Sequence, residues 1–212
     1  MKILAVSDQV VDRIYSLASQ GQFRDVSLIL GCGDLPYDYL EYLVSVLNVP
    51  LYYVPGNHDP EYDQRRAAAR AEGCTNLDLR LTHTRFGLTL AGFGGSVRYK
   101  PQGPNQYSQI EASARALSLL PALTWNRLRG RRLDILLAHS PPLGIHDSDG
   151  AHEGLSALNL LIRWARPRYL LHGHTHFYRQ NLETSETHFL DTHIINIFPY
   201  KILDIATRNE QR

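Results

Sequence analysis

The sequence contains little cysteine and no long uninterrupted apolar segment. Its two cysteines, Cys32 and Cys74, are too few for a disulfide framework, so a disulfide-stapled scaffold is excluded. We find no segment long and apolar enough for a secretion signal or a membrane-spanning helix. We therefore expect a cytoplasmic protein that does not associate with a membrane.

The chain also lacks an excess of charge of either sign. Its 22 lysines and arginines are balanced by 21 acidic residues, for a formal net charge of +1. No overall electrostatic field therefore draws the protein toward nucleic acid. The basic run between Arg127 and Arg132 has no aromatic residues interleaved for stacking on bases, so we interpret it as a solvated helix end. Nucleic acid is not expected as a partner, and the sequence does not indicate an oligomeric state.

What the chain does contain is a regular alternation of short apolar runs and longer amphipathic segments. The apolar runs are typical of buried parallel strands, and we predict strands over 2–6, 26–30, 51–54, 135–138 and 169–171. Segments of helical length and periodicity lie between or beside them, at 10–20, 36–47, 61–72, 108–128 and 154–165. Strands that alternate with helices indicate parallel crossover units, in which the strand ends collect along one edge of a sheet.

Two further stretches are rich in β-strand signals. Runs at 77–81 and 88–93 alternate as strands around a turn at Phe86-Gly87, and three more short strands are predicted at 187–189, 194–198 and 202–205. No repeat, low-complexity segment or linker separates them from the first half. With 212 residues, of which 43% are apolar, we expect one α/β domain over residues 1–212 with a second mixed sheet packed on the first.

Five short polar segments follow the predicted parallel strands. They are Ser7-Asp8, Gly33-Asp34, Gly56-Asn57-His58-Asp59, Ala138-His139-Ser140 and Gly173-His174-Thr175-His176. Loops at the carboxyl ends of strands are where α/β proteins place their sites. Burying this many carboxylate, amide and imidazole groups without a compensating cation costs several kcal/mol each. The segments therefore indicate a site for divalent metal ions, and its carboxylate-rich donor set differs from the cysteine-rich sets of structural zinc.

Taken in order, these segments resemble the calcineurin-like metallophosphoesterases over residues 8–176. Any one of them alone is a weak signal, whereas five in the right order, each after a strand, are specific. The resemblance implies two mixed β-sheets packed as a sandwich and flanked by helices, a four-layer α/β/β/α fold. It also implies a dinuclear metal centre that hydrolyses phosphate esters with a metal-bound hydroxide as the nucleophile.

The resemblance further implies a role for each matching position. The first ion would be bound by Asp8, Asp34 and His176. The second ion would share Asp34 as a bridge and add Asn57, His139 and His174. His58 would lie beside the phosphoryl group as a catalytic residue, and Asp59 would orient His58. This mixed oxygen and nitrogen donor set suits two divalent transition metal ions, Mn, Fe, Zn or Ni, better than Ca or Mg.

The chain departs from the family pattern at one ligand. The first motif of the family reads Asp-x-His, whereas this chain has Asp8-Gln9-Val10. Gln9 cannot replace the imidazole, because in an extended segment it points away from the side on which Asp8 and Val10 lie. We therefore expect weaker binding at the first metal position. A water molecule could fill the gap, a ligand could come from elsewhere in the chain, or the centre could hold a single ion.

Three residues are candidates for binding substrate. Arg98 lies in a loop predicted to rim the site, where its planar side chain could pair with a phosphate, and the neighbouring Tyr99 could stack on a base. His146 and His152 lie in the loop after His139. The alternatives are a solvated arginine on the rim and a histidine that caps a helix.

The sequence thus predicts a metal-dependent phosphoesterase that acts on a small phosphorylated substrate. A phosphodiester or nucleotide-type ester is favoured over a phosphomonoester, with manganese among the candidate metals. The alternative is a catalytically degenerate protein that binds metal or nucleotide, which the substitution at Val10 favours. Retention of His58 and Asp59 argues against that alternative, because a pure scaffold has no chemical need for them.

Overall fold

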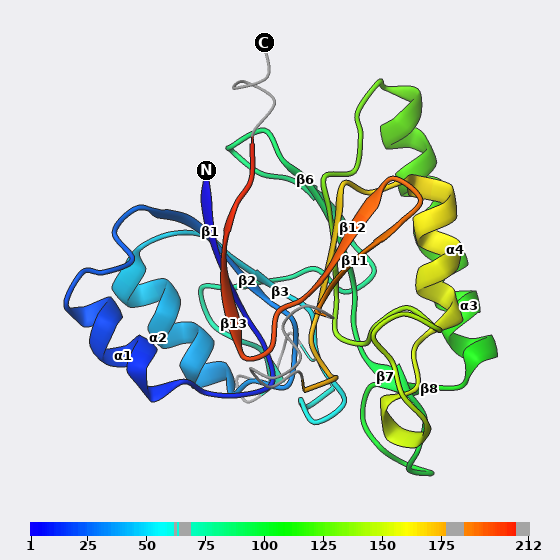
Figure 1. Ribbon diagram of the computed structural model, residues 1–212, viewed down its shortest axis with the longest axis horizontal. Helices are drawn as coiled ribbons and strands as arrows, with labels where there is room; N and C mark the ends of the chain where they lie inside the picture. The colour runs from blue at the N-terminus through cyan, green and yellow to red at the C-terminus, as the bar shows by residue number, and fades with distance from the viewer. Residues whose placement is uncertain (62, 64–68, 177–184, 207–212) are drawn as a thin grey trace.

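Two mixed β-sheets lie face to face at the centre of the protein, and a pair of helices covers the outer face of each sheet (Figure 1). The computed structural model describes residues 1–61, 63, 69–176 and 185–206. The four layers, from helices through two sheets to helices, confirm the predicted fold class.

The first sheet contains the N-terminal strands. Its order is β13-β1-β2-β3-β4, with β1 (Lys2–Val6), β2 (Val26–Gly31), β3 (Leu51–Tyr53) and β4 (Thr75–Asn76) parallel to one another. The edge strand β13 (Tyr200–Asp204) pairs antiparallel with β1. Helices α1 (Asp12–Ser19) and α2 (Tyr37–Leu47) connect consecutive strands and pack on the outer face. The parallel connections place the ends of β1, β2 and β3 along one edge.

The second sheet follows the order β11-β12-β10-β9-β6-β5. Its centre is parallel and consists of β6 (Thr89–Phe93), β9 (Ile135–Ala138), β10 (Tyr169–His172) and β12 (Thr192–Asn196). The two edge strands, β5 (Leu81–His83) and β11 (Glu186–Phe189), are antiparallel to their neighbours. The strand predicted over 77–81 is wrong in its position, because Leu79 adopts a left-handed backbone (φ 53°) and regular pairing begins only at Leu81.

Helices α3 (Gln109–Leu128) and α4 (Ser156–Ala165) cover the outer face of the second sheet. A capping box starts α3, in which the Ser108 side chain accepts from the Glu111 amide while Glu111 accepts from the Ser108 amide. A short parallel pair, β7 (Ser96–Val97) and β8 (Gln106–Tyr107), and the 3-10 turn η2 (Gly150–His152) lie near the site edge. Half of the helix predicted over 61–72 lies outside the described residues, and the described half, residues 61, 63 and 69–72, forms no α-helix. None of the described helices has the length and apolar character that crossing a bilayer requires.

The interface between the two sheets is a continuous apolar layer. Leu137 and Leu171 from the second sheet meet Leu28 and Leu30 from the first in one buried cluster. Two further clusters fill the space between each sheet and its helices. Because apolar burial on both faces requires near-continuous apolar strands, this packing accounts for the runs seen in the sequence.

We predict that Leu171→Ala destabilises the protein by about 2–5 kcal/mol, because the residue is 0% exposed in the layer between the sheets and its removal leaves a cavity. Urea unfolding followed by circular dichroism would measure the change. The control is Ile110→Ala on α3, a side chain that is 83% exposed, which should alter stability by no more than about 0.5 kcal/mol. A loss below about 1 kcal/mol for Leu171→Ala would contradict tight packing here.

Candidate metal centre

The loops after five parallel strands meet at one edge of the sandwich and surround a cavity of about 360 Å³. Three of these loops follow β1, β2 and β3 of the first sheet, and two follow β9 and β10 of the second. Backbone hydrogen bonds join neighbouring loops, since the Asp8 amide donates to Gly33 and the Gly173 amide donates to His139. The side chains around the cavity are those of Asp8, Asp34, Asn57, His58, Tyr99, Ala151, His152, His174 and His176.

One group of ligands is formed by Asp34, His139 and His174, whose donor atoms lie within 4.8 Å of one another. His139 Nε2 is 3.4 Å from Asp34 Oδ2 and 2.9 Å from Asn57 Oδ1. The Asn57 amide nitrogen donates to the Tyr99 hydroxyl (3.0 Å), so its carbonyl oxygen faces His139. The structure thus brings together all four residues that the resemblance assigns to the second ion.

The hydrogen bonds of the two histidines leave a nitrogen of each available for a metal. His139 Nδ1 must carry the hydrogen in its contact with the Cys32 carbonyl (2.8 Å), because a carbonyl only accepts. In the neutral ring Nε2 therefore carries no hydrogen, and this is the nitrogen that faces Asp34 and Asn57. His174 Nε2 donates to the Ala151 carbonyl (2.7 Å), which leaves the lone pair of its Nδ1 free to bind a metal ion. Asp34, Asn57 and the neutral His139 therefore direct hydrogen-bond acceptor atoms toward one another, and none of these atoms carries a hydrogen. A cation satisfies this arrangement, so the residues present fit a divalent metal ion.

Without metal, a proton on His139 compensates the same arrangement. Burial alone would lower the pKa of His139, but the negative charge of Asp34 outweighs it and raises this pKa to about 9. Burial would raise the pKa of Asp34, whereas the positive charge of His139 lowers it to about 2. Burial lowers the pKa of His174 to about 3, so that imidazole stays neutral and able to bind metal.

Asp8 and His176 form a second group on the other side of the cavity. His176 Nε2 lies 3.7 Å from Asp8 Oδ1, and its ring stacks on Phe198 with centroids 4.3 Å apart. The Asp8 carboxylate also accepts from the Ser7 hydroxyl. The His174 amide donates to both of its oxygens, at 3.1 Å to Oδ1 and 3.0 Å to Oδ2. Burial opposes ionisation of Asp8, but the nearby His176 imidazole and the positive charge of His139, together with these hydrogen bonds, lower its pKa. Asp8 and His176 therefore meet as predicted, with Asp8 held as an anion.

The backbone at three of the candidate metal ligands is unusual. Asp8, Asp34 and His174 all adopt left-handed conformations, with φ of 61°, 55° and 65°. These turns place each side chain directly over the end of its strand. Gly173 is required beside them, because a Cβ atom there would overlap Ser7 Oγ and Asp8 Oδ2.

His58 lies at the open side of the cavity, where its side chain is 64% exposed. Its Nε2 is 4.0 Å from Asp34 Oδ2 and 3.5 Å from the Tyr99 hydroxyl, and its backbone amide donates to Asp34 Oδ1 (2.8 Å). The sequence predicts for Tyr99 only stacking on a base. Its hydroxyl instead contacts both Asn57 and His58, residues so distant along the chain that the sequence carries no local signal for the link.

Asp59 does not contact the His58 ring, which it was expected to orient. Its buried carboxylate accepts from the backbone amides of Asp34 (2.9 Å) and Gly56 (2.8 Å) and thereby joins two of the ligand-bearing loops. Burial and the nearby charge of Asp34 raise its pKa to about 6, although the two amides act in the opposite direction. Asn105 supports the same loop by donating to the carbonyls of Gly56 and Asp59.

Of the three residues expected to contact substrate, only His152 lines the cavity. Arg98 forms an ion pair with Glu111 (2.8 Å) and lines a neighbouring pocket instead. His146 turns toward the second sheet, where its Nδ1 donates to His172 (2.9 Å) and its Nε2 accepts from the Thr187 hydroxyl (2.9 Å). Burial lowers the pKa of His146 to about 4, as expected for a neutral interior imidazole.

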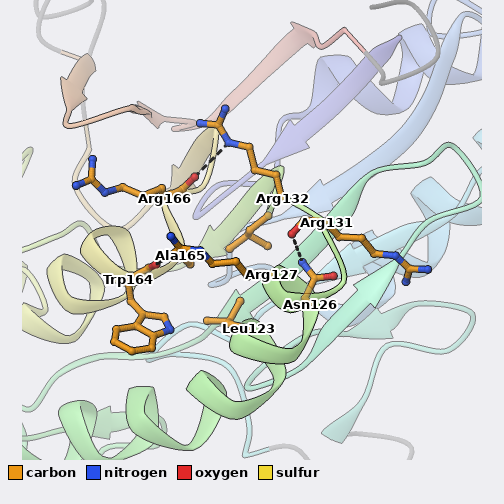
Figure 2. Close-up of a pocket in the computed structure, with 10 residues that line it drawn as sticks. Leu123, Asn126, Arg127, Arg131, Arg132, Trp164, Ala165 and Arg166 are labelled. Atoms are coloured by element: carbon orange, nitrogen blue, oxygen red, sulfur yellow. Dashed lines mark hydrogen bonds between the residues drawn. The ribbon is translucent and has the colours of Figure 1, made fainter. Parts of the chain in front are cut away.

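A second pocket, of about 310 Å³, lies where α3 and α4 end (Figure 2). The basic run lines it, but its arginines bind the ends of the helices. Arg127 donates to the Trp164 carbonyl and Arg132 to the Arg166 carbonyl, each at 3.4 Å. Carbonyls of the last helical turn lack partners within the helix, so these arginines serve as C-terminal caps. The prediction that the run forms a helix end is confirmed.

We predict that Gly173→Ala weakens metal binding by about 10–100-fold, because the added methyl group displaces the Asp8 carboxylate. Titration calorimetry with Mn²⁺ would measure the affinity. The control is Gly87→Ala, where a Cβ meets no atom within 4 Å but a φ of 78° strains the backbone. This control should lose about 1 kcal/mol of stability and retain its metal affinity. Equal affinities in both variants would contradict the role of Gly173.

We also predict that the ion bound by His139 displaces a proton from it. Because the pKa of that imidazole is raised to about 9 without metal, affinity should increase by up to about tenfold per pH unit as the pH rises, and level off above pH 9. Calorimetry near neutral pH, in buffers of different ionisation enthalpy, should show about one proton released per ion bound there. Binding with no proton release near neutral pH would contradict this assignment.

Known proteins of similar structure share the fold of this chain. The chain resembles TT1561 of Thermus thermophilus at 20% identity, with a TM-score of 0.60 over 92% of this chain and 88% of that one. It also resembles the Plasmodium protein GAP50 at 15% identity, with a TM-score of 0.50 over 92% and 70% of the two chains. No curated protein matches significantly. The profile of the calcineurin-like phosphoesterases matches residues 1–178, and the chain belongs to that family.

Proposed function

We propose that this protein is a metal-dependent phosphoesterase that hydrolyses a small phosphodiester or nucleotide-type phosphate ester. The observation that carries the proposal is the convergence of acceptor atoms from Asp34, Asn57, His139 and His174 beside the Asp8–His176 pair, with His58 at the open side. In this proposal Asp34 bridges the two groups, as the family resemblance implies, and the centre holds a pair of ions. Mn, Fe, Zn and Ni all accept these donors.

When bound, divalent ions at these donors polarise phosphoryl oxygens and lower the pKa of bound water toward ~7. The chain itself contributes positioning. The Asn57 loop is held by the Tyr99 hydroxyl and by Asn105, and the Asp34 loop is held by Asp59. These bonds fix the ligand side chains before substrate arrives, so little reorganisation is needed on binding.

His58 is the residue best placed to act on the leaving group. It is exposed at the cavity and its ring is not a member of either ligand group, so its imidazole remains available to a bound ester. The Tyr99 hydroxyl, 3.5 Å from Nε2, limits the rotation of the ring. A proton delivered by His58 to the departing oxygen would assist expulsion of a poor leaving group.

The charges around the cavity favour a diester over a monoester. Among the described residues that line it, none is a lysine or arginine, because Arg98 is paired with Glu111 outside. A diester carries one negative charge and a monoester carries up to two. A cavity without fixed cationic side chains compensates the single charge of a diester more completely than the double charge of a monoester.

We also propose that the protein acts in the cytoplasm.

A protein that binds metal or nucleotide without turnover is the second candidate. Val10 supports it, because its side chain packs against the apolar cluster of α1 and α2 and supplies no ligand. GAP50, described as the anchor in the inner membrane complex of Plasmodium, shares the fold, so the architecture alone does not imply catalysis. The placement of His58 at the cavity supports the enzyme.

We predict that His58→Ala lowers kcat by about 10²–10⁴-fold for an alkyl phosphodiester and by much less for bis(p-nitrophenyl) phosphate, whose leaving group departs without a proton. Steady-state kinetics with the Mn²⁺-loaded protein would measure both values, and metal content should be unchanged. The control His188→Ala removes an imidazole on β11 away from the cavity. Equal losses for the two esters would argue against proton donation. Absence of turnover in the wild-type protein, with metal bound, would favour the second candidate.

A further inference from the structure

One imidazole at the cavity has no role in the ligand set described above. His139, His174 and His176 are assigned to metal and His58 to the leaving group, which leaves His152 of η2. The group of Asp8 and His176 has fewer donors than the group around His139, since Asn57 and two imidazoles already serve the latter. The surplus imidazole and the shortage of donors occur in the same cavity.

The loop that carries His152 is tied directly to the metal ligands. The carbonyl of Ala151, the preceding residue, accepts from His174 Nε2 at 2.7 Å. On the other side, the Glu153 carboxylate accepts from Gln109 of α3 (2.9 Å), and the Gly154 amide donates to Asp147 (3.1 Å). Both flanks of His152 are therefore fixed, and its half-buried ring is held against the cavity.

The separation of the His152 and His176 rings is one at which two imidazoles can bind the same ion. The His152 centroid lies 5.1 Å from that of His174 and 6.1 Å from that of His176. An ion that binds two imidazole nitrogens at ~2.0–2.1 Å holds the ring centres ~4.5 Å apart when the two ligands lie at a right angle and ~6.4 Å apart when they lie opposite each other. The assigned pair of His139 and His174, at 4.8 Å, falls in the same range.

We propose that His152 is a metal ligand, supplying the missing imidazole to the ion bound by Asp8 and His176. The proposal rests on the proposed function only in requiring a dinuclear centre. Two imidazoles, His152 and His176, together with the Asp8 carboxylate form a donor set that divalent transition metals accept. His152 thus takes the place of the ligand that Val10 does not provide, and it reaches the ion from η2 rather than from the loop after β1.

Metal titration distinguishes this role from contact with substrate. His152→Ala removes the whole ring, whereas His152→Phe keeps an aromatic ring without a nitrogen, so together they separate lost coordination from lost packing. His188→Ala serves as the matched control, because it removes an imidazole outside the cavity. Each protein is titrated with Mn²⁺ by calorimetry and with Co²⁺ by visible absorption, in the absence of substrate.

We expect wild type and His188→Ala to bind two ions per chain. Both His152 variants should bind the ion at His139 normally and the ion at Asp8 more than ~10-fold more weakly, since loss of even an outer partner of a ligand costs ~10–100-fold. The Co²⁺ absorption of the weakened ion should decrease accordingly. Two ions of unchanged affinity in both variants, with a raised KM, would overturn the proposal and make His152 a substrate contact, while the proposed function would stand. A wild-type protein that binds only one ion would also overturn it, and one that binds none would overturn the proposed function as well.

Discussion

The structure depends on one electrostatic constraint, the convergence of acceptor groups at an edge where two sheets meet. Asp34 Oδ2 and Asn57 Oδ1 both face the same nitrogen of His139, and that nitrogen cannot turn away because the other one is bonded to Cys32. Only a proton or a metal ion relieves this repulsion. The left-handed backbone at Asp8, Asp34 and His174 persists because the loops around it are bonded to one another.

Two acidic groups in this centre accept hydrogen bonds from the backbone. Asp59 accepts from the amides of Asp34 and Gly56 in two of the loops, and Asp8 accepts from the amide of His174, a candidate ligand. A change at either position therefore alters the placement of other ligands. Their effects on metal affinity and on folding are coupled, because residues in one hydrogen-bond network do not act additively.

The parts predicted from sequence are those with a local signal. Apolar runs and their polar ends predicted the parallel strands and the positions of Asp34, Asn57, His139 and His174, because parallel strand ends must meet at one edge. Arg98 was misplaced because its partner, Glu111, belongs to the capping box that begins the next helix. His146 was misplaced because its left-handed backbone, with a φ of 60°, turns the ring toward His172. Periodicity carries no information on either contact.

The connection between β12 and β13 determines when the centre can form during synthesis. The Pro199 carbonyl accepts from the Ser7 amide, and Phe198 supports the ring of His176, so this connection backs the Asp8 loop. Asp8 is made well before its support, because about 190 residues separate it from Phe198. At ~5–20 residues per second, the loop emerges on the order of ten seconds or more before the segment that holds it. A nascent chain therefore carries β1 and the Asp8 carboxylate without their final neighbours during that interval, and the Asp8 side of the centre is completed only after the connection between β12 and β13 has been made.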